Sequence, residues 1–228
     1  MADRPAPSGR RASPSRLPRG RHGLTREEVA ADQRARMMAA LAEAMAERGY
    51  AATTVADVLR SARVSRETFY EHFDSKLDCF LQTFDAAADL LVVGMAERGA
   101  LVREGPPFDR VDRAIRGYLA LIGEHPNEAR LFLVESWAAG PAVLERRAAV
   151  QATLADGLIA IVGLEADEDR FAARALVAAI GAMVSAALAA NDTAGVHALA
   201  DPAVALAARM LSLGADGDRR YARRPWTG

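Results

Sequence analysis

Residues 49–76 read GYAATTVADVLRSARVSRETFYEHFDSK, a stretch in which residues that start helices alternate with short apolar helical patterns. Thr54, followed three residues later by Asp57, has the spacing of a capping box in which Asp replaces the usual Glu. Ser65 and Ser75 are further N-cap candidates. The stretch therefore predicts two short helices joined by a turn of about three residues, with a longer helix after Ser75.

Helical patterns extend in both directions from this stretch. An apolar face runs from residue 25 to about residue 48, where Gly49 is a typical C-terminal stop, and a heptad-like pattern continues from residue 75 to about residue 95. Proline and glycine separate further helical patterns, which we expect at residues 108–125, 127–139, 141–162, 168–190 and 196–213. Since alanine is abundant and β-branched runs are scarce, the sequence predicts an all-α protein.

Composition narrows the class of protein. A chain of 228 residues, half of them apolar, is long enough for one large or two modest folded units. A single cysteine, Cys79, excludes an intrachain disulfide, and the uncharged residues 175–190 are too short for a membrane span. There is no apolar signal segment in the first residues, so we expect a cytoplasmic protein.

Both ends of the chain read as segments outside the folded units. Residues 1–23 are rich in Pro, Arg, Ser and Gly and predict a disordered basic arm, while residues 215–228 predict a C-terminal tail. Such an arm either follows the backbone of DNA or is only a solvated tail, and both interpretations stay open.

The motif in residues 49–76 resembles a known signature. A Gly-aromatic pair, Thr-Thr-Val, Asp-Val-Leu, Val-Ser, Thr-Phe-Tyr, His-Phe and Ser-Lys follow one another as in the DNA-binding domain of the TetR (tetracycline-repressor-like) family. The resemblance covers residues 25 to about 85 in sequence, and the rest only in its helical layout. It implies an N-terminal three-helix helix-turn-helix domain at residues 24–80. A C-terminal helical bundle at residues 81–214 would bind an effector and form the dimer.

The predicted DNA-contacting residues lie at helix starts and in the turn. A helix-turn-helix places the first turn of its second helix in the major groove, where Arg66, Glu67 and Thr68 could read guanine, cytosine and thymine. The resemblance implies phosphate contacts from the flanking polar residues. The full predicted set is Thr54, Arg63, Ser65, Arg66, Glu67, Thr68, Tyr70, His72 and Lys76.

Some of these residues have a second interpretation. Thr54 and Ser65 are needed as helix caps whatever the function, and His72 fits equally well as a solvated surface residue. Arg63 stands where the family usually has glycine. A positive φ there costs a non-glycine residue about 1 kcal/mol, which a phosphate contact would offset or which simply makes the domain less stable. Lys76 is the single lysine of the sequence.

The C-terminal half predicts two further sites. Apolar and hydrogen-bonding residues at Phe84, Leu91, Met95, Tyr118, Phe132, Glu135 and Trp137 are candidates for an effector pocket, although each is also a core candidate. Two apolar stripes on one helix exceed what a single core needs. With the family resemblance, they predict a dimer interface at Leu176, Ile180, Gly181, Met183, Val184, Leu188, Leu206 and Met210.

Other functional classes find little support in the sequence. The four histidines are scattered, and we find no nucleophile beside a base, metal cluster or phosphate-binding glycine loop, so we expect no enzyme and no cofactor. The favoured interpretation is a repressor that a small molecule releases from a palindromic operator. The alternatives keep the fold and replace the effector with a protein partner, or with redox chemistry at Cys79, whose place in the first turn of a helix would favour a thiolate.

Overall fold

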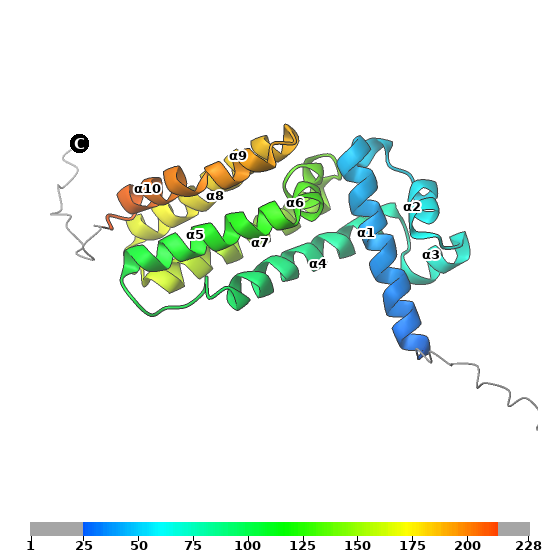
Figure 1. The fold of residues 1–228 in the computed structure, drawn as a ribbon, viewed down its shortest axis with the longest axis horizontal. Helices are drawn as coiled ribbons and strands as arrows, with labels where there is room; N and C mark the ends of the chain where they lie inside the picture. The colour runs from blue at the N-terminus through cyan, green and yellow to red at the C-terminus, as the bar shows by residue number, and fades with distance from the viewer. Residues whose placement is uncertain (1–24, 214–228) are drawn as a thin grey trace, which may run out of the picture.

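The computed structural model describes residues 25–213, and within that range it contains helices and no strands. Figure 1 shows a small unit at one end and a long bundle beside it. The elements are α1 (Arg26–Ala52), α2 (Val55–Ala62), α3 (Arg66–His72), α4 (Lys76–Glu97), α5 (Pro107–Glu124), α6 (Pro126–Leu133), the 3-10 turn η1 (Glu135–Trp137), α7 (Pro141–Val162), α8 (Asp167–Ala189), α9 (Thr193–Ala198) and α10 (Ala200–Met210). The all-α prediction is confirmed. The predicted N-terminal arm and C-terminal tail lie outside the described residues.

The small unit is formed by α1, α2 and α3, packed around one apolar face. Met37, Leu41 and Met45 of α1 are fully buried, and Phe69 and Phe73 lie against them with ring centroids 5.4 Å apart. Burial of these side chains holds the short helices in place, since helices of seven or eight residues are not stable by themselves. The two buried phenylalanines therefore anchor α3 in the small unit.

The bundle is formed by α4 to α10. Helix α4 leaves the small unit and runs along α5 and α6, while α9 and α10 lie on the side of the bundle away from α4 (Figure 1). Helix α5 also packs on α7, and α8 packs on α6, α7 and α10. Apolar faces thus converge on a shared interior from several helices, which is how a helical bundle forms its core.

The predicted stop at Gly49 is confirmed, since its φ of 77° and ψ of 166° interrupt the helix there; residues 50–52 add one short turn that was not predicted. Two other predicted helices are divided in the structure. The predicted helix at residues 127–139 ends at Leu133 and continues as η1, and the predicted helix at residues 196–213 is divided into α9 and α10. In these two cases apolar periodicity alone did not show the break.

Helices α4 and α8 are long and apolar enough to meet the length and composition of a membrane span. Both also pack against several other helices of the bundle. Core helices of helical bundles have the same composition, so these two helices are weak evidence for a membrane.

Candidate DNA-binding surface and effector cavity

Two hydroxyl caps fix the positions of α2 and α3. The Thr54 hydroxyl donates to Asp57 Oδ2 (2.7 Å) and accepts from the Asp57 N–H (3.3 Å). The Ser65 hydroxyl accepts from the Thr68 N–H (3.0 Å) and shares a hydrogen bond with the Thr68 hydroxyl (2.9 Å). Both predicted caps are therefore present. The roles of Thr54 and Ser65 toward DNA stay predictions.

The turn between α2 and α3 depends on a left-handed residue. Arg63 has φ 55° and ψ 48° and ends α2, so the conformation expected from the missing glycine is confirmed. The Arg36 guanidinium of α1 donates to the carbonyl of Ala62 in the last turn of α2 (3.1 Å). The turn thus depends on the left-handed conformation of Arg63 and on the hydrogen bond from Arg36. The Arg63 side chain itself is exposed.

The outer face of α3 carries the predicted base-reading residues. Arg66, Glu67 and Tyr70 are exposed, and the Arg66 guanidinium lies 6.0 Å from the centre of the Tyr70 ring. Thr68 and His72 are half-buried at the edges of this face. The first turn of α3 is therefore accessible to a groove of DNA, as a recognition helix requires.

Asp57 binds two arginines that were not among the predicted DNA-contacting residues. Its Oδ1 accepts from Arg48 (3.2 Å) and from Arg60 (3.3 Å). Hydrogen bonds from the Thr54 hydroxyl and N–H, and then the charge of Arg48, lower the pKa of Asp57 from 3.8 to about 2. The carboxylate therefore stays ionised and keeps both guanidinium groups beside the start of α2. A signal was present in the sequence, since Arg60 lies three residues after the capping Asp57.

Lys76 contacts protein atoms rather than open solvent. Its ammonium donates to the carbonyls of Tyr50 (2.8 Å) and Thr53 (2.9 Å), and lies 4.0 Å from the centre of the Tyr50 ring. Burial lowers the pKa of Lys76 from its ordinary value of 10.5. Two of its three N–H donors thus tie the end of α1 to the start of α4. The predicted phosphate contact is left to the third donor and stays a prediction.

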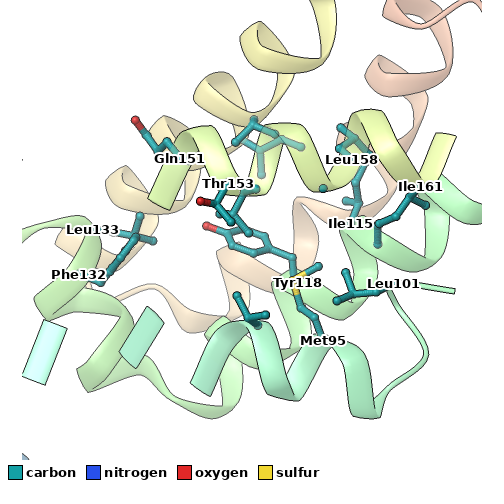
Figure 2. A pocket seen from close by; sticks show the side chains of 17 residues that line it. Met95, Leu101, Ile115, Tyr118, Phe132, Leu133, Gln151, Thr153, Leu158 and Ile161 are labelled. Atoms are coloured by element: carbon teal, nitrogen blue, oxygen red, sulfur yellow. The ribbon is translucent and has the colours of Figure 1, made fainter. Parts of the chain in front are cut away.

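A cavity of about 180 Å³ lies inside the bundle. Its walls are almost wholly apolar, and Tyr118, Gln151 and Thr153 supply the polar side chains. In Figure 2 the ring of Tyr118 extends across the cavity and its hydroxyl lies beside Thr153. The lining comes from α4, the loop after it, and α5 to α8: Val92, Met95, Leu101, Ala114, Ile115, Tyr118, Phe132, Leu133, Gln151, Thr153, Leu154, Gly157, Leu158, Ile161, Val177, Ile180 and Gly181.

The Tyr118 hydroxyl has no hydrogen-bond partner among the described residues. Burial raises the pKa of Tyr118 to about 12, although the positive charge of Arg147 acts in the opposite direction. The phenol therefore stays protonated and can donate. Because Tyr118 borders the cavity, its hydroxyl is available to donate to a ligand with an acceptor atom.

Three of the seven predicted pocket residues line the cavity, namely Met95, Tyr118 and Phe132. The other four do not line it, which corrects their assignment to the pocket. Phe84 and Leu91 are buried in the core outside this cavity, because their side chains pack between helices.

Glu135 and Trp137 do not line the cavity, because the helix expected at residues 127–139 ends before them, at Leu133. The Glu135 carboxylate instead accepts from the Tyr50 N–H, and Trp137 is 65% exposed, with its ring 4.9 Å from the Arg147 guanidinium. The lining residues of α7 were not predicted. Gly157, a glycine inside a helix, was the available signal for them.

The predicted dimer residues mostly lie inside their own subunit. Five of the eight are buried in the core, namely Leu176, Ile180, Gly181, Val184 and Leu188. They therefore offer no free surface, which corrects their assignment to an interface. The stripe was assigned to the wrong side because residues 175–189 of α8 carry no charge on any face.

Part of the remaining surface of α8 and α10 is apolar. Met183 is exposed, and Leu206 and Met210 are half-buried, so their predicted role at an interface stays a prediction. Phe171 is 73% exposed on α8, and Ala178, Ala182 and Ala186 of the same helix are exposed.

Cys79 lies in the core of the protein. It is 0% exposed, and burial raises the pKa of its thiol to about 12. The expectation that a helix start would favour a thiolate is wrong here, because loss of hydration outweighs the helix dipole. The redox alternative loses its basis with it.

Comparison with known proteins agrees with this arrangement. Residues 37–83 match the family model of bacterial regulatory proteins of the tetR family. The HTH-type transcriptional activator FasR of Mycolicibacterium smegmatis is 28% identical over 179 residues, which cover 77% of this chain and 75% of that protein.

Solved structures share the fold. FadR from Bacillus subtilis in complex with stearoyl-CoA matches with a TM-score of 0.65 at 18% identity, over 76% of this chain and 96% of that one. A TetR-like regulator from Rhodococcus sp. RHA1 matches with a TM-score of 0.61 at 23% identity, over 83% of this chain and 98% of that one. The chain is therefore similar to DNA-binding transcriptional regulators of the TetR family, in sequence over residues 37–83 and in fold over the bundle as well.

Proposed function

We propose that the chain acts in the cytoplasm as a homodimer that binds a near-palindromic operator and is released when an effector with a long apolar chain enters the cavity. The observation that carries this proposal is the apolar cavity with one unpaired phenol hydroxyl directed into it. Pockets of this kind, apolar with a few placed polar groups, are typical of small-molecule sites.

The DNA part of the proposal rests on the accessible face of α3. Two such helices in a dimer would read half-sites about 34 Å apart, or somewhat more. Arg66 and Thr68 would contact bases, and Tyr70 and Lys76 phosphates. His72, Thr54, Ser65 and Arg63 would flank these contacts.

A selected duplex tests this division. We expect Arg66→Ala and Thr68→Ala to cost about 1–3 kcal/mol on an operator selected from random DNA, and little on a scrambled duplex. Tyr70→Phe should weaken binding similarly on both. Fluorescence anisotropy over a salt series separates the two kinds of contact. Equal losses on both duplexes from the Arg66 variant would contradict base reading by α3.

The dimer is proposed to form through α8 and α10. The exposed side of α8 presents Phe171 and Met183 together with Ala178, Ala182 and Ala186. Small side chains at this spacing let two helices approach closely, and water would leave an apolar surface on contact. We expect Ala182→Glu to yield monomers in sedimentation velocity. Ala160→Glu, at an exposed alanine of α7, is the control that should leave the assembly unchanged.

The proposed effector is an acyl thioester. The Bacillus subtilis FadR structure holds stearoyl-CoA, and the apolar lining of the present cavity suits an acyl chain. The Tyr118 hydroxyl would donate to the thioester carbonyl. At about 180 Å³ the cavity is below the ~300–1,000 Å³ typical of ligand pockets, so we expect it to widen when the chain enters. The exposed Thr153 marks the side from which a charged head group would stay in solvent.

Gly157 lines the cavity, and a Cβ added there meets no atom within 4 Å, so the position accepts a side chain that would occupy space at the cavity wall. We expect Gly157→Leu to weaken binding of stearoyl-CoA at least tenfold in calorimetry, whereas Ala160→Leu one turn away should not. Coenzyme A alone should not bind, because it lacks the chain. Equal affinities for both variants would place the ligand elsewhere.

The sign of regulation is the second readout. We propose release of a repressor, while the related FasR is named an activator. Transcription from the selected operator, with and without stearoyl-CoA, separates the two. If stearoyl-CoA, stearate and related esters all leave DNA affinity unchanged within about twofold, a protein partner becomes the favoured regulator.

A further inference from the structure

The small unit meets the bundle at the kink of α1. Gly49 turns the chain with a positive φ, and the next residue, Tyr50, is held from two sides. Its N–H donates to Glu135 Oε2 (2.8 Å), and its carbonyl accepts from Lys76 (2.8 Å). A Cβ added at Gly49 would lie 3.3 Å from Glu135 Oε2, so the bundle contacts the kink closely.

Glu135 belongs to the same short segment that forms one wall of the cavity. Phe132 and Leu133 line the cavity, and Glu135 follows two residues later, at the start of η1. Arg147 holds this segment by donating to the carbonyls of Phe132 and Leu133 and to the Ser136 hydroxyl. A displacement of the cavity wall is therefore a displacement of the segment that carries Glu135.

The Glu135 carboxylate is also tied to the end of α8. It is 7% exposed, and its Oε1 lies 3.6 Å from Arg130 Nε. The Arg130 guanidinium donates in turn to the carbonyl of Leu188 (2.6 Å) and to Asn191 Oδ1 (3.2 Å). A buried carboxylate is stable when it is paired and hydrogen-bonded, so moving it would disturb partners on α1 and α6 together.

A second line of contacts joins the cavity wall to Tyr50. The rings of Phe132 and Phe84 stack with centroids 4.4 Å apart, Phe84 and Phe80 are 6.4 Å apart, and Phe80 meets Tyr50 edge to face at 5.3 Å. This aromatic row lies along α4. The polar contact of Glu135 and the aromatic row therefore start at the same wall and end at the same residue.

We propose that Glu135 is a positioning residue for the DNA-binding helices, which couples the cavity wall to the α1 kink through its hydrogen bond to the Tyr50 N–H. The inference rests on the proposed control of DNA binding by an effector and adds the contact that transmits it. When the chain of the effector displaces Phe132 and Leu133, Glu135 moves with them. The kink then shifts, and with it α1 and the helices packed on it. Coupling of this kind changes affinity typically by about 5–150-fold.

Three variants test the coupling. Glu135→Ala removes the acceptor, Glu135→Gln keeps an acceptor oxygen of the same reach, and Glu145→Ala removes an exposed carboxylate of α7 as the matched control. For each protein, operator Kd is measured with and without saturating stearoyl-CoA, and stearoyl-CoA Kd is measured by calorimetry. The ratio of the two operator Kd values is the coupling. If Glu135 had only a structural role, its substitution would not change this ratio while the affinities for free operator and for stearoyl-CoA stayed the same.

We expect the ratio to fall to within about twofold of one in Glu135→Ala, while the stearoyl-CoA Kd stays within about threefold of the wild type. Glu135→Gln should restore most of the ratio, and Glu145→Ala should keep all of it. A wild-type ratio in Glu135→Ala would overturn the inference. Loss of operator binding in both Glu135 variants without effector would overturn it too. Glu135 would then be needed for the fold of the DNA-binding helices rather than for their coupling to the cavity.

Amide hydrogen exchange decides the matter even without an effector. If stearoyl-CoA leaves the wild-type operator Kd unchanged, the proposed function fails, and the coupling is then tested with Gly157→Leu, which fills the cavity permanently. We expect that substitution to change the exchange rate of the Tyr50 amide at least threefold, and to have no such effect in the Glu135→Ala background. If the exchange rate of the Tyr50 amide is the same in Gly157→Leu as in the wild type, the inference is overturned.

Discussion

The helices of the small unit, together with α4, begin differently from the later helices of the bundle. Each of α1 to α4 starts at a Thr or Ser whose hydroxyl accepts the N–H three residues further on. In the bundle, α5, α6, α7, α8 and α10 start without a side-chain cap, and α9 is capped by Asp192. Caps are local interactions of about 1 kcal/mol each, whereas burial of one large core side chain contributes several-fold more. The helices of the small unit are thus positioned by local caps, and the later helices of the bundle are held by packing.

The largest effect should come from the packing of the bundle. Leu176 of α8 is 0% exposed, so Leu176→Ala should lower the free energy of unfolding by about 2–5 kcal/mol. Urea denaturation followed by circular dichroism measures this. Since the side chain faces its own core, the proposed dimer should persist in sedimentation at concentrations where the variant is folded. A stable variant that sediments as a monomer would return Leu176 to the interface.

A cap in the small unit should matter less. Thr54→Ala should cost about 1 kcal/mol of stability, because α2 loses its N-cap. The pKa of Asp57 should rise from about 2 toward 3.8, since the Thr54 hydrogen bond is the largest cause of its lowering. In the wild type this lowering stabilises the fold above pH 3.8, and the contribution is lost as the pH falls to about 2. Carboxyl NMR titration measures the shift, with Thr54→Ser as the control that keeps the hydroxyl.

The turn offers a smaller effect of opposite sign. Arg63→Gly should raise stability by up to about 1 kcal/mol, because glycine adopts a φ of 55° without strain. Arg63→Ala keeps the unfavourable conformation and should not be stabilised, so it separates backbone strain from loss of charge. If Arg63 contacts phosphate, both variants bind DNA more weakly at low salt. Thermal denaturation and anisotropy give the two readouts, and a destabilised glycine variant would show that the Arg63 side chain itself supports the turn.

The smallest expected effect is no reaction at all. The Cys79 thiol is buried and its pKa is about 12, so thiol reagents at neutral pH should leave the folded protein unlabelled. Mass spectrometry after treatment with iodoacetamide checks this, and the unfolded chain in denaturant is the positive control. Rapid labelling of the native protein would reopen the redox alternative.

The contrast between local caps and packing also explains which parts of the structure could be predicted from the sequence. Caps are short-range signals, and Thr54, Ser65 and Ser75 located α2, α3 and the start of α4 correctly. Burial in the bundle depends on which neighbour covers each face. Residues 175–189 of α8 carry no charge, so Leu176 and Val184 were assigned to a partner although their own subunit covers them.

The cavity was predicted only in part for a related reason. Tyr118 and Phe132 stood out as bulky residues, while the wall opposite them is formed by α7, where Gly157 contributes by its lack of a side chain. The role of Glu135 depends on the end of α6 at Leu133, which no proline or glycine marks. Neither feature could be read from apolar periodicity.

Lys76 gives the molecule an unusual chemical property. It is the only lysine of the sequence, and it stands at the point where α1 and α4 meet. Amine-selective reagents thus have a single side-chain target, located at the junction that operator binding and the cavity would both strain. Its reaction rate would report, in the unlabelled natural sequence, how often the ammonium leaves the carbonyls of Tyr50 and Thr53. The chain therefore carries its own site-specific reporter of domain movement, without the introduction of any foreign probe.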